Sequence, residues 1–166
     1  GVEKGISVIE MDKTIFITGA SGFIGSNLAK RILSTEPDTK VIGLDNMNDY
    51  YDVSIKEWRL KEIEKLNGQW TFVKGDIADK ETIDDIFAEY KPSVVVNLAA
   101  QAGVRYSITN PDAYIRSNLI GFYNILEACR HRATITEQLE WSIWYMLPAH
   151  QSMERTRKFR TAQMTK

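Results

Sequence analysis

Short apolar runs rich in β-branched residues alternate, over the first 131 residues, with longer segments whose apolar positions recur every three or four residues. The short runs predict strands over residues 14–18, 41–44, 70–73 and 93–100. The last run is almost continuously apolar, which is typical of a strand covered by helices on both faces. Strands that alternate with helices through right-handed crossovers predict an α/β fold with a doubly wound parallel sheet.

Two helices are expected in the first half of the chain. Apolar residues at helical spacing mark the first over residues 24–32, and Pro37 ends it. The second is expected to begin at a capping box formed by Ser54 and Glu57 and to end near Leu66.

Two more helices follow. Asp79 is expected to cap the third, whose apolar stripe runs to Tyr90, and Asn110 followed by proline opens the fourth. The fourth is expected to bury one face made of Ile115, Leu119, Phe122, Leu126 and Cys129. On that face Cys129, the single cysteine, is expected to be a small core residue and not a nucleophile.

The first strand breaks directly into three glycines spaced three residues apart, Gly19, Gly22 and Gly25, and then into a helix. The first amides of a helix have no internal partner, and its dipole favours anions, so such a turn can hold a diphosphate. Gly19 would allow a sharp exit from the strand, Gly22 a close approach of backbone to phosphate, and Gly25 close packing of the helix. A surface hairpin or an ordinary turn between strand and helix can carry the same pattern.

An acid at the end of the second strand supports the diphosphate interpretation. Asp45 lies 20 residues after Gly25, where a carboxylate can accept both adenosine ribose hydroxyls and repel the 2′-phosphate of NADP. The expected cofactor is therefore NAD. The alternative is a solvated aspartate that opens the turn over residues 45–49.

The ends of the third and fourth strands extend this site. Asp76 and Ile77 are expected beside the adenine, as hydrogen-bond acceptor and apolar floor, although Asp76 could simply start a turn. The first and fourth strands should flank the point where the strand order reverses, so ligand should lie over Gly19–Gly25 and Leu98–Gln101. These features predict a Rossmann-type sheet.

Composition narrows the class of protein. A chain of 166 residues is expected to form one domain, and its net charge of −1 gives no footprint for nucleic acid. There is no apolar stretch of the length that a membrane span requires, so no membrane partner and a cytoplasmic location are expected. Residues 1–12 are interpreted as a leader.

Five parts of the chain carry a family resemblance: Thr18–Gly25, Asp45–Asn46, Gly75–Ile77, Leu98–Ser107 and Asn118. They resemble the extended short-chain dehydrogenases, which are NAD-dependent nucleotide-sugar epimerases and dehydratases. Within that family, residues 45–52 and 102–107 are most similar to the UDP-glucuronate 4-epimerases. The resemblance covers residues 13–131, and Asn97 departs from it, because the group often has histidine there.

The resemblance implies an NAD site, a UDP-sugar site and a homodimer through the helix over residues 110–130. The residues that it assigns to NAD are Gly19, Ser21, Gly22, Phe23, Ile24, Gly25, Asp45, Asn46, Asp76, Ile77, Leu98, Ala99, Ala100 and Asn118. It places Gly103, Val104 and Arg105 near the sugar, while a surface ion pair accounts for Arg105 equally well.

Enzymes of this family oxidise C4 of the sugar with NAD and return the hydride to the other face, using the tyrosine of a Tyr-x-x-x-Lys motif as base. None of the seven tyrosines here is followed by lysine at that spacing. The chain is therefore assigned no catalytic residue, and no metal-binding residue.

The composition changes at Arg132. The last 35 residues contain no glycine, whereas the first 131 contain ten. One reading frame away, the codons compatible with this tail permit Glu-His-Leu-Val-Tyr-Ala-Ser-Ser-Ser-Ser-Val-Tyr-Gly, which resembles the family's fifth strand and serine segment. The valine is forced by Trp144–Tyr145 and the glycine by Met153–Glu154. We interpret residues 132–166 as the product of a frameshift, and the rival is a natural short protein with its own C-terminus.

This interpretation predicts a sheet truncated after about four to five strands. The β-prone residues 141–147 could take the fifth-strand position, and residues 150–166 are expected to be solvated. The predicted function is that of the NAD-binding N-terminal part of a nucleotide-sugar 4-epimerase, without turnover of sugar by this chain alone. The alternatives are a non-catalytic NAD sensor and a non-functional fragment.

Overall fold

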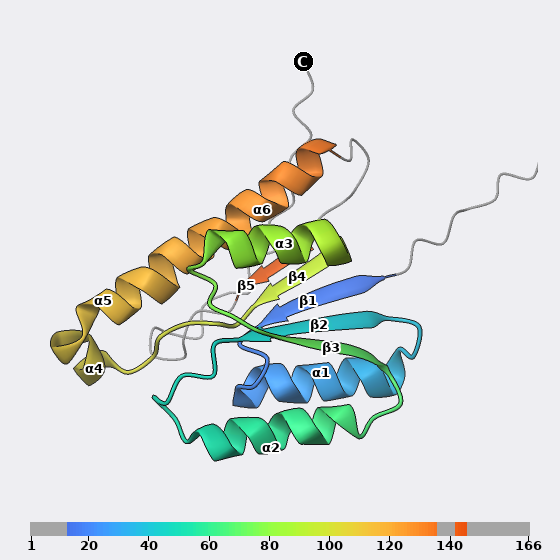
Figure 1. Cartoon of the computed structure of the whole chain (residues 1–166), viewed down its shortest axis with the longest axis horizontal. Coiled ribbons are helices and arrows are strands. Elements are labelled where there is room, and N and C mark those ends of the chain that lie inside the picture. Colours follow the sequence, from blue (N-terminus) through green and yellow to red (C-terminus); the bar gives the residue numbers. More distant parts are fainter. Residues whose placement is uncertain (1–12, 136–141, 146–166) are drawn as a thin grey trace, which may run out of the picture.

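One parallel sheet organises residues 13–135 and 142–145, the part of the chain that the computed structural model describes (Figure 1). The strand order is β3-β2-β1-β4-β5, so the order reverses between β1 and β4, as the sequence predicted. The strands are β1 (Thr14–Thr18), β2 (Lys40–Asp45), β3 (Gln69–Lys74), β4 (Val94–Asn97) and β5 (Ser142–Tyr145). The expected leader, residues 136–141 and residues 146–166 lie outside the described residues.

Helices cover both faces of the sheet, which confirms the doubly wound α/β fold (Figure 1). They are α1 (Phe23–Thr35), α2 (Val53–Glu64), α3 (Lys80–Tyr90), α4 (Val104–Thr109), α5 (Pro111–Tyr114), the π-helix η1 (Ile115–Gly121) and α6 (Phe122–Ile135). Successive residues of β1 serve the two faces: Ile15 and Ile17 pack with α1 and α2, and Phe16 packs with α3 and α6. None of the described helices is both long and apolar enough to cross a bilayer.

The start of α2 differs from the expected capping box. Asp52, and not Ser54, caps the helix, because its carboxylate accepts from the Ser54 amide at 2.9 Å. Ser54 lies inside the first turn of α2, and its hydroxyl donates to the same carboxylate at 2.7 Å. At α3 the expected cap is confirmed, since the Asp79 side chain accepts from the Glu81 amide.

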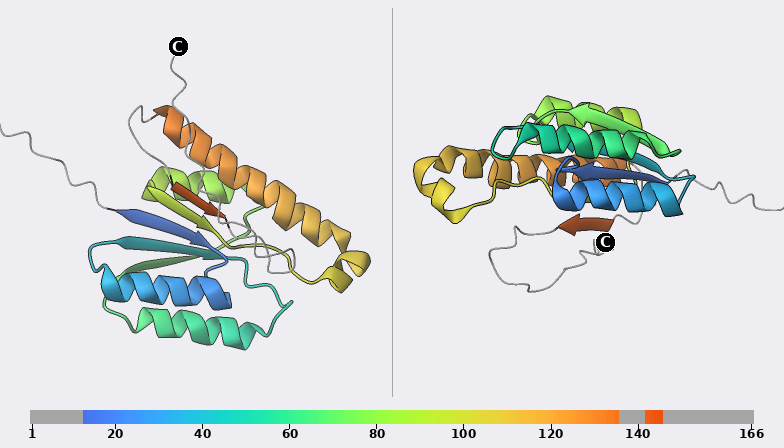
Figure 2. Two further views of the ribbon diagram at one scale, coloured as in Figure 1. Left: turned by 180° about the vertical axis from the view of Figure 1, so that it is seen from behind. Right: turned by 90° about the horizontal axis from the view of Figure 1, so that it is seen from below.

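The expected buried face of the fourth helix is wrong except at Cys129, since Leu126 is exposed and Phe122 is only partly buried. Segments α5, η1 and α6 form one rod, and on it Ile115 and Leu119 are 50% and 61% exposed. The buried side of the rod instead carries Gly121, Asn124, Ile125, Ala128 and Cys129. A π-helix has a wider turn than an α-helix, so Ile115 and Leu119 in η1 do not share with α6 the face that a spacing of 3.6 assumes. Leu126 lies within α6, where the buried face instead includes Ile125. Figure 2 shows that the α4 end of the rod also projects beyond the strands.

Cys129 is a core residue, as expected. It is buried against α3 within the core cluster on that face of the sheet. Burial raises the pKa of its thiol to about 12, so the reactive thiolate is scarce at neutral pH.

Strand β4 is shorter than the apolar run that predicts it. It ends at Asn97, where the amides of Leu98 and Ala99 turn to the Thr18 hydroxyl oxygen at 3.1 and 3.0 Å. On its other side β4 pairs in parallel with β5, so the expected β-prone segment does occupy the fifth-strand position.

Candidate functional site

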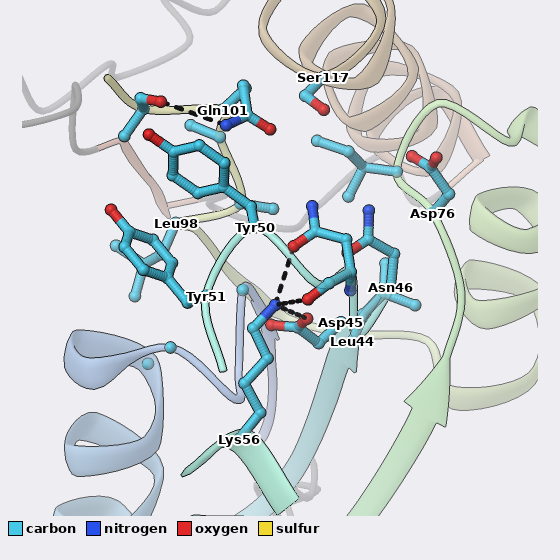
Figure 3. Close-up of a pocket in the computed structure, with 18 of the residues that line it drawn as sticks. Leu44, Asp45, Asn46, Tyr50, Tyr51, Lys56, Asp76, Leu98, Gln101 and Ser117 are labelled. Atoms are coloured by element: carbon cyan, nitrogen blue, oxygen red, sulfur yellow. Dashed lines mark hydrogen bonds and ion pairs between the residues drawn. The ribbon is translucent and has the colours of Figure 1, made fainter. Parts of the chain in front are cut away.

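A cavity of about 360 Å³ opens at the carboxyl ends of β1, β2, β3 and β4 (Figure 3). In a parallel sheet whose strand order reverses between two strands, this edge is where ligands bind. The cavity is lined by Gly19, Gly22, Phe23, Ile24, Gly25, Leu44, Asp45, Asn46, Asn48, Tyr50, Tyr51, Lys56, Gly75, Asp76, Ile77, Leu98, Ala99, Ala100, Gln101, Ala102 and Ser117.

Two of the three glycines in the turn are required by packing. Gly19 has a φ of +68°, and a Cβ there would lie 2.9 Å from the Ala99 nitrogen. A Cβ on Gly25 would lie 2.3 Å from the Gly19 carbonyl oxygen. The expected sharp exit and close helix packing are therefore confirmed. A Cβ on Gly22 would lie 3.1 Å from the Gly19 carbonyl oxygen, a close contact that a small shift of this carbonyl would have to relieve, so Gly22 is less strictly required than the other two glycines.

The N-terminus of α1 differs from those of α2, α3 and α5. Its N-cap is Gly22, which makes no side-chain capping bond, and its first turn contains no acid. The N-termini of α2, α3 and α5 are each capped by a side chain, from Asp52, Asp79 and Asn110. The first amides of α1 thus remain available at the cavity, which suits an anionic group such as a diphosphate.

Asp45 lies at the end of β2 and is 9% exposed, so it is not solvated, although its side chain does open the turn that follows by accepting from the Met47 amide. One carboxylate oxygen accepts from the Ser21 amide at 3.2 Å, and the other accepts from the Met47 amide at 2.9 Å. The second oxygen also lies 3.7 Å from the ammonium nitrogen of Lys56 (Figure 3). A fixed carboxylate at this place can accept ribose hydroxyls.

Lys56 is a cavity residue that the sequence analysis missed. It is 7% exposed, and its ammonium donates to the Asn48 carbonyl at 2.9 Å and to the Asn48 side-chain oxygen at 3.0 Å. The available signal was periodicity: Lys56 stands four residues before Leu60 and seven before Ile63, the other buried residues of α2. A lysine at the spacing of the buried apolar residues of a helix indicates that its charge is buried with them.

Asp76 and Ile77 both line the cavity. Asp76 also starts a turn, since its side chain accepts from the Ala78 amide at 2.8 Å, and it forms an ion pair with Arg116 at 3.0 Å. Both interpretations of this residue are therefore compatible with its position. Ile77 is 5% exposed, as an apolar floor requires, and its carbonyl accepts from the Asn124 amide group at 3.0 Å.

Asn118 is not among the lining residues, but it is hydrogen-bonded to the backbone of one of them, Gln101. Its side-chain oxygen accepts from the Gln101 amide at 2.8 Å, and its amide group donates to the Gln101 carbonyl at 3.1 Å. This pair of bonds fixes the segment after β4.

Ser21 also lies outside the lining of the cavity. It is fully buried, and its hydroxyl has no hydrogen-bond partner among the described residues.

The three residues expected near a sugar lie on α4, which the sequence analysis did not predict, and they do not line the cavity. Gly103 is the N-cap of α4 with a φ of 98°, and its carbonyl accepts from the Tyr114 hydroxyl. Val104 is 62% exposed and Arg105 is also exposed. Of the residues just before them in the chain, Ala102 does line the cavity.

Together the parallel sheet, the glycine turn and the buried carboxylate define a nucleotide-binding domain of the Rossmann type. The chain belongs to the family described as GDP-mannose 4,6 dehydratase, whose sequence profile matches residues 16–140. The expected relationship to the extended short-chain dehydrogenases is thereby confirmed.

Relatives and solved structures are similar to the same part of the chain. Protein CapI of Staphylococcus aureus is 55% identical over 117 residues, which cover 70% of this chain and 34% of CapI. UDP-glucuronate 4-epimerase 4 of Arabidopsis thaliana is 44% identical over 117 residues, which cover 70% of this chain and 26% of that protein. The chain therefore spans about a third or less of the length of these curated relatives.

A solved structure extends the similarity to three dimensions. It is the UDP-glucuronic acid 4-epimerase from Bacillus cereus in complex with UDP-glucuronic acid and NAD, with a TM-score of 0.64 and 30% identity. The match covers 71% of this chain and 36% of that structure.

Proposed function

We propose that this chain is the NAD-binding N-terminal part of a nucleotide-sugar 4-epimerase that interconverts UDP-glucuronate and UDP-galacturonate. The observation that carries the proposal is the cavity. There the uncapped N-terminus of α1, which follows β1, lies near the buried carboxylate of Asp45, which ends the neighbouring strand β2. The names of the relatives support the choice of UDP-glucuronate as substrate and of NAD as cofactor.

The cavity residues fit NAD from one end to the other. The uncapped N-terminus of α1 at Gly22 would hold the diphosphate, and Asp45 would accept the ribose hydroxyls. Asp76 and Ile77 would lie beside the adenine, and the segment Leu98–Ala100 would lie toward the nicotinamide. When bound, NAD supplies the hydride acceptor and donor for the epimerisation.

The UDP-sugar is proposed to bind the whole enzyme beside α4, where Gly103, Val104 and Arg105 lie. A guanidinium such as that of Arg105 suits the phosphates or carboxylate of this substrate. The proton-transferring Tyr-x-x-x-Lys pair is absent from the sequence of this chain. We therefore propose that the chain binds the cofactor without epimerising sugar by itself, in the cytoplasm.

The frameshift near Arg132 is our proposed reason for the missing pair. Sequencing the DNA across codons 125–145 tests it, and the expected result is an insertion or deletion relative to related genes. One uninterrupted frame, together with related proteins that carry the same tail, would refute the frameshift.

A homodimer through the rod is also proposed. The outer side of the rod exposes Ile115, Leu119, Ile120 and Tyr123, which are each between 47% and 61% exposed. An apolar stripe of this kind on a helix packs well against the same stripe of a second copy.

The decisive experiment is a calorimetric titration of the chain with NAD, followed by an assay for conversion of UDP-glucuronate. Saturable NAD binding without conversion is the expected result. A folded chain that does not bind NAD would refute the proposed function. Conversion of the sugar would refute the claim that this chain lacks its catalytic groups.

A further inference from the structure

We propose that Lys56 makes the ribose end of the cavity a latent site for a 2′-phosphate, which the carboxylate of Asp45 keeps closed. Removing the charge of Asp45 is then expected to turn the preference of the protein from NAD toward NADP. The inference rests on the proposed function, because it assumes that the cavity binds a dinucleotide.

Lys56 brings a positive charge to a place with little access to water. Its ammonium lies 3.7 Å from an Asp45 oxygen, and the two side chains are each 9% exposed. Both residues line the cavity together with Asn48 (Figure 3). The cation and the carboxylate therefore compensate one another at the position where the ribose hydroxyls are expected.

The ammonium is held by more than the ion pair. It donates to the Asn48 carbonyl and to the Asn48 side-chain oxygen, at 2.9 and 3.0 Å. These two acceptors are neutral, so they hold Lys56 in place without cancelling its charge when Asp45 is replaced. A buried cation without a counterion attracts an anion, because the alternative is an uncompensated charge in a site of low dielectric constant.

Two further donors converge on the same carboxylate. The amides of Ser21 and Met47 both donate to Asp45, at 3.2 and 2.9 Å. A shorter side chain at position 45 frees both amides and the ammonium of Lys56. An ammonium with two amides is a suitable donor set for a phosphate dianion, which offers three acceptor oxygens.

A purely structural role for Lys56 makes a different prediction. In that case the lysine only neutralises Asp45, and its removal has the same effect on NAD and NADP. In the proposed role its effect depends on the 2′-phosphate and on the residue at position 45. Comparing single and double variants separates these two roles.

The test titrates five proteins with NAD and with NADP by calorimetry at one fixed ionic strength. They are the wild type, Asp45→Ser, Lys56→Met, the double variant, and Lys61→Met, which removes an exposed lysine of the same helix. Asp45→Ser is expected to raise the affinity for NADP relative to NAD by roughly tenfold to a hundredfold, the effect of a charge-assisted hydrogen bond. The double variant should lose this gain, and Lys61→Met should resemble the wild type.

A wild type that binds NAD, with equal NADP affinity in Asp45→Ser and in the double variant, would overturn the inference but leave the proposed function intact. A folded wild type that binds neither dinucleotide would overturn both. If Asp45→Ser does not fold, Asp45→Asn takes its place, because it removes the charge and keeps the shape. The second readout is the melting temperature in the presence of adenosine 2′-monophosphate. This ligand is expected to raise the melting temperature of the Asp45 variant but not that of the same variant with Lys56→Met.

Discussion

All five residues of β1 are buried, whereas Ile115 and Leu119 on the rod are half or more exposed. On α1, which follows β1, the large apolar residues that remain exposed, Phe23 and Ile24, both line the cavity. On the rod the exposed apolar residues Ile115, Leu119 and Tyr123 include none that line this cavity. The first region is therefore closed by its own chain and the proposed cofactor, whereas the second offers an exposed apolar surface to the proposed second copy of the chain.

The largest expected effect is on the stability of the core around β1, which we call the closed region. Phe16→Ala should lower the free energy of unfolding by about 3–5 kcal/mol, since it empties a fully buried site where Phe16 packs edge-on to Phe87. Urea unfolding measures the change. Phe23→Ala is the matched control, because Phe23 is 71% exposed, and it should change the free energy far less. Equal losses in the two variants would contradict the difference between core and cavity mouth.

The next effect concerns the turn. Gly22→Asp should weaken NAD binding on the order of a hundredfold, because the new carboxylate repels the diphosphate and competes for the helix amides. The variant should still fold, since the new Cβ requires only a small shift of the Gly19 carbonyl, 3.1 Å away, and aspartate is a good N-cap. Calorimetry measures the affinity, and Gly22→Ala, which adds a methyl group without charge, should lose less. Unchanged affinity in Gly22→Asp would exclude the turn as the diphosphate site.

The rod provides a third test. Leu119→Lys should weaken self-association by at least about tenfold, because it places a charge in the proposed interface between copies. Sedimentation equilibrium measures the dissociation constant. Trp58→Lys on α2 is the control, since Trp58 is 57% exposed on the opposite face of the sheet. If both variants associate like the wild type, the rod is not the interface.

The smallest effect is electrostatic. The hydrogen bond from the Thr82 hydroxyl is the main cause that holds the pKa of Asp79 below its ordinary value. A lowered folded pKa stabilises the protein above the unfolded pKa, at about pH 4, and this contribution is lost as the pH falls through the folded value. Thr82→Val should therefore raise the pKa of Asp79 in an NMR titration. The difference in melting temperature from the wild type should shrink as the solution is acidified below pH 4, and a difference that grows instead would contradict this sign.

The sequence predicted most of the closed region because its signals are local. Strand β1, the glycine turn and the acid at the end of β2 all lie within residues 14–45, and each has a physical requirement that few residue types meet. Gly19 illustrates this: its positive φ favours glycine, so the residue type reports the backbone conformation. The strand order followed from alternating elements and right-handed crossovers.

The errors share a different origin. The capping box at Ser54 failed because Asp52, two residues earlier, offered a competing acceptor. The face of the last helix failed because η1 changes the number of residues per turn, which no periodicity of 3.6 can reveal. Lys56 was missed because a lysine in a helix is usually expected to be exposed to solvent.

By itself the sequence determined the α/β class, the parallel order of the strands and the position of the nucleotide site, since these follow from local apolar patterns and from the conformational freedom of glycine. Only the tertiary structure decided that Lys56 pairs with Asp45, that Asn118 fixes the Gln101 backbone and that the rod exposes its apolar stripe. Each of these depends on elements distant in sequence packing against one another, and the distance between two side chains is set by that packing and not by their spacing along the chain.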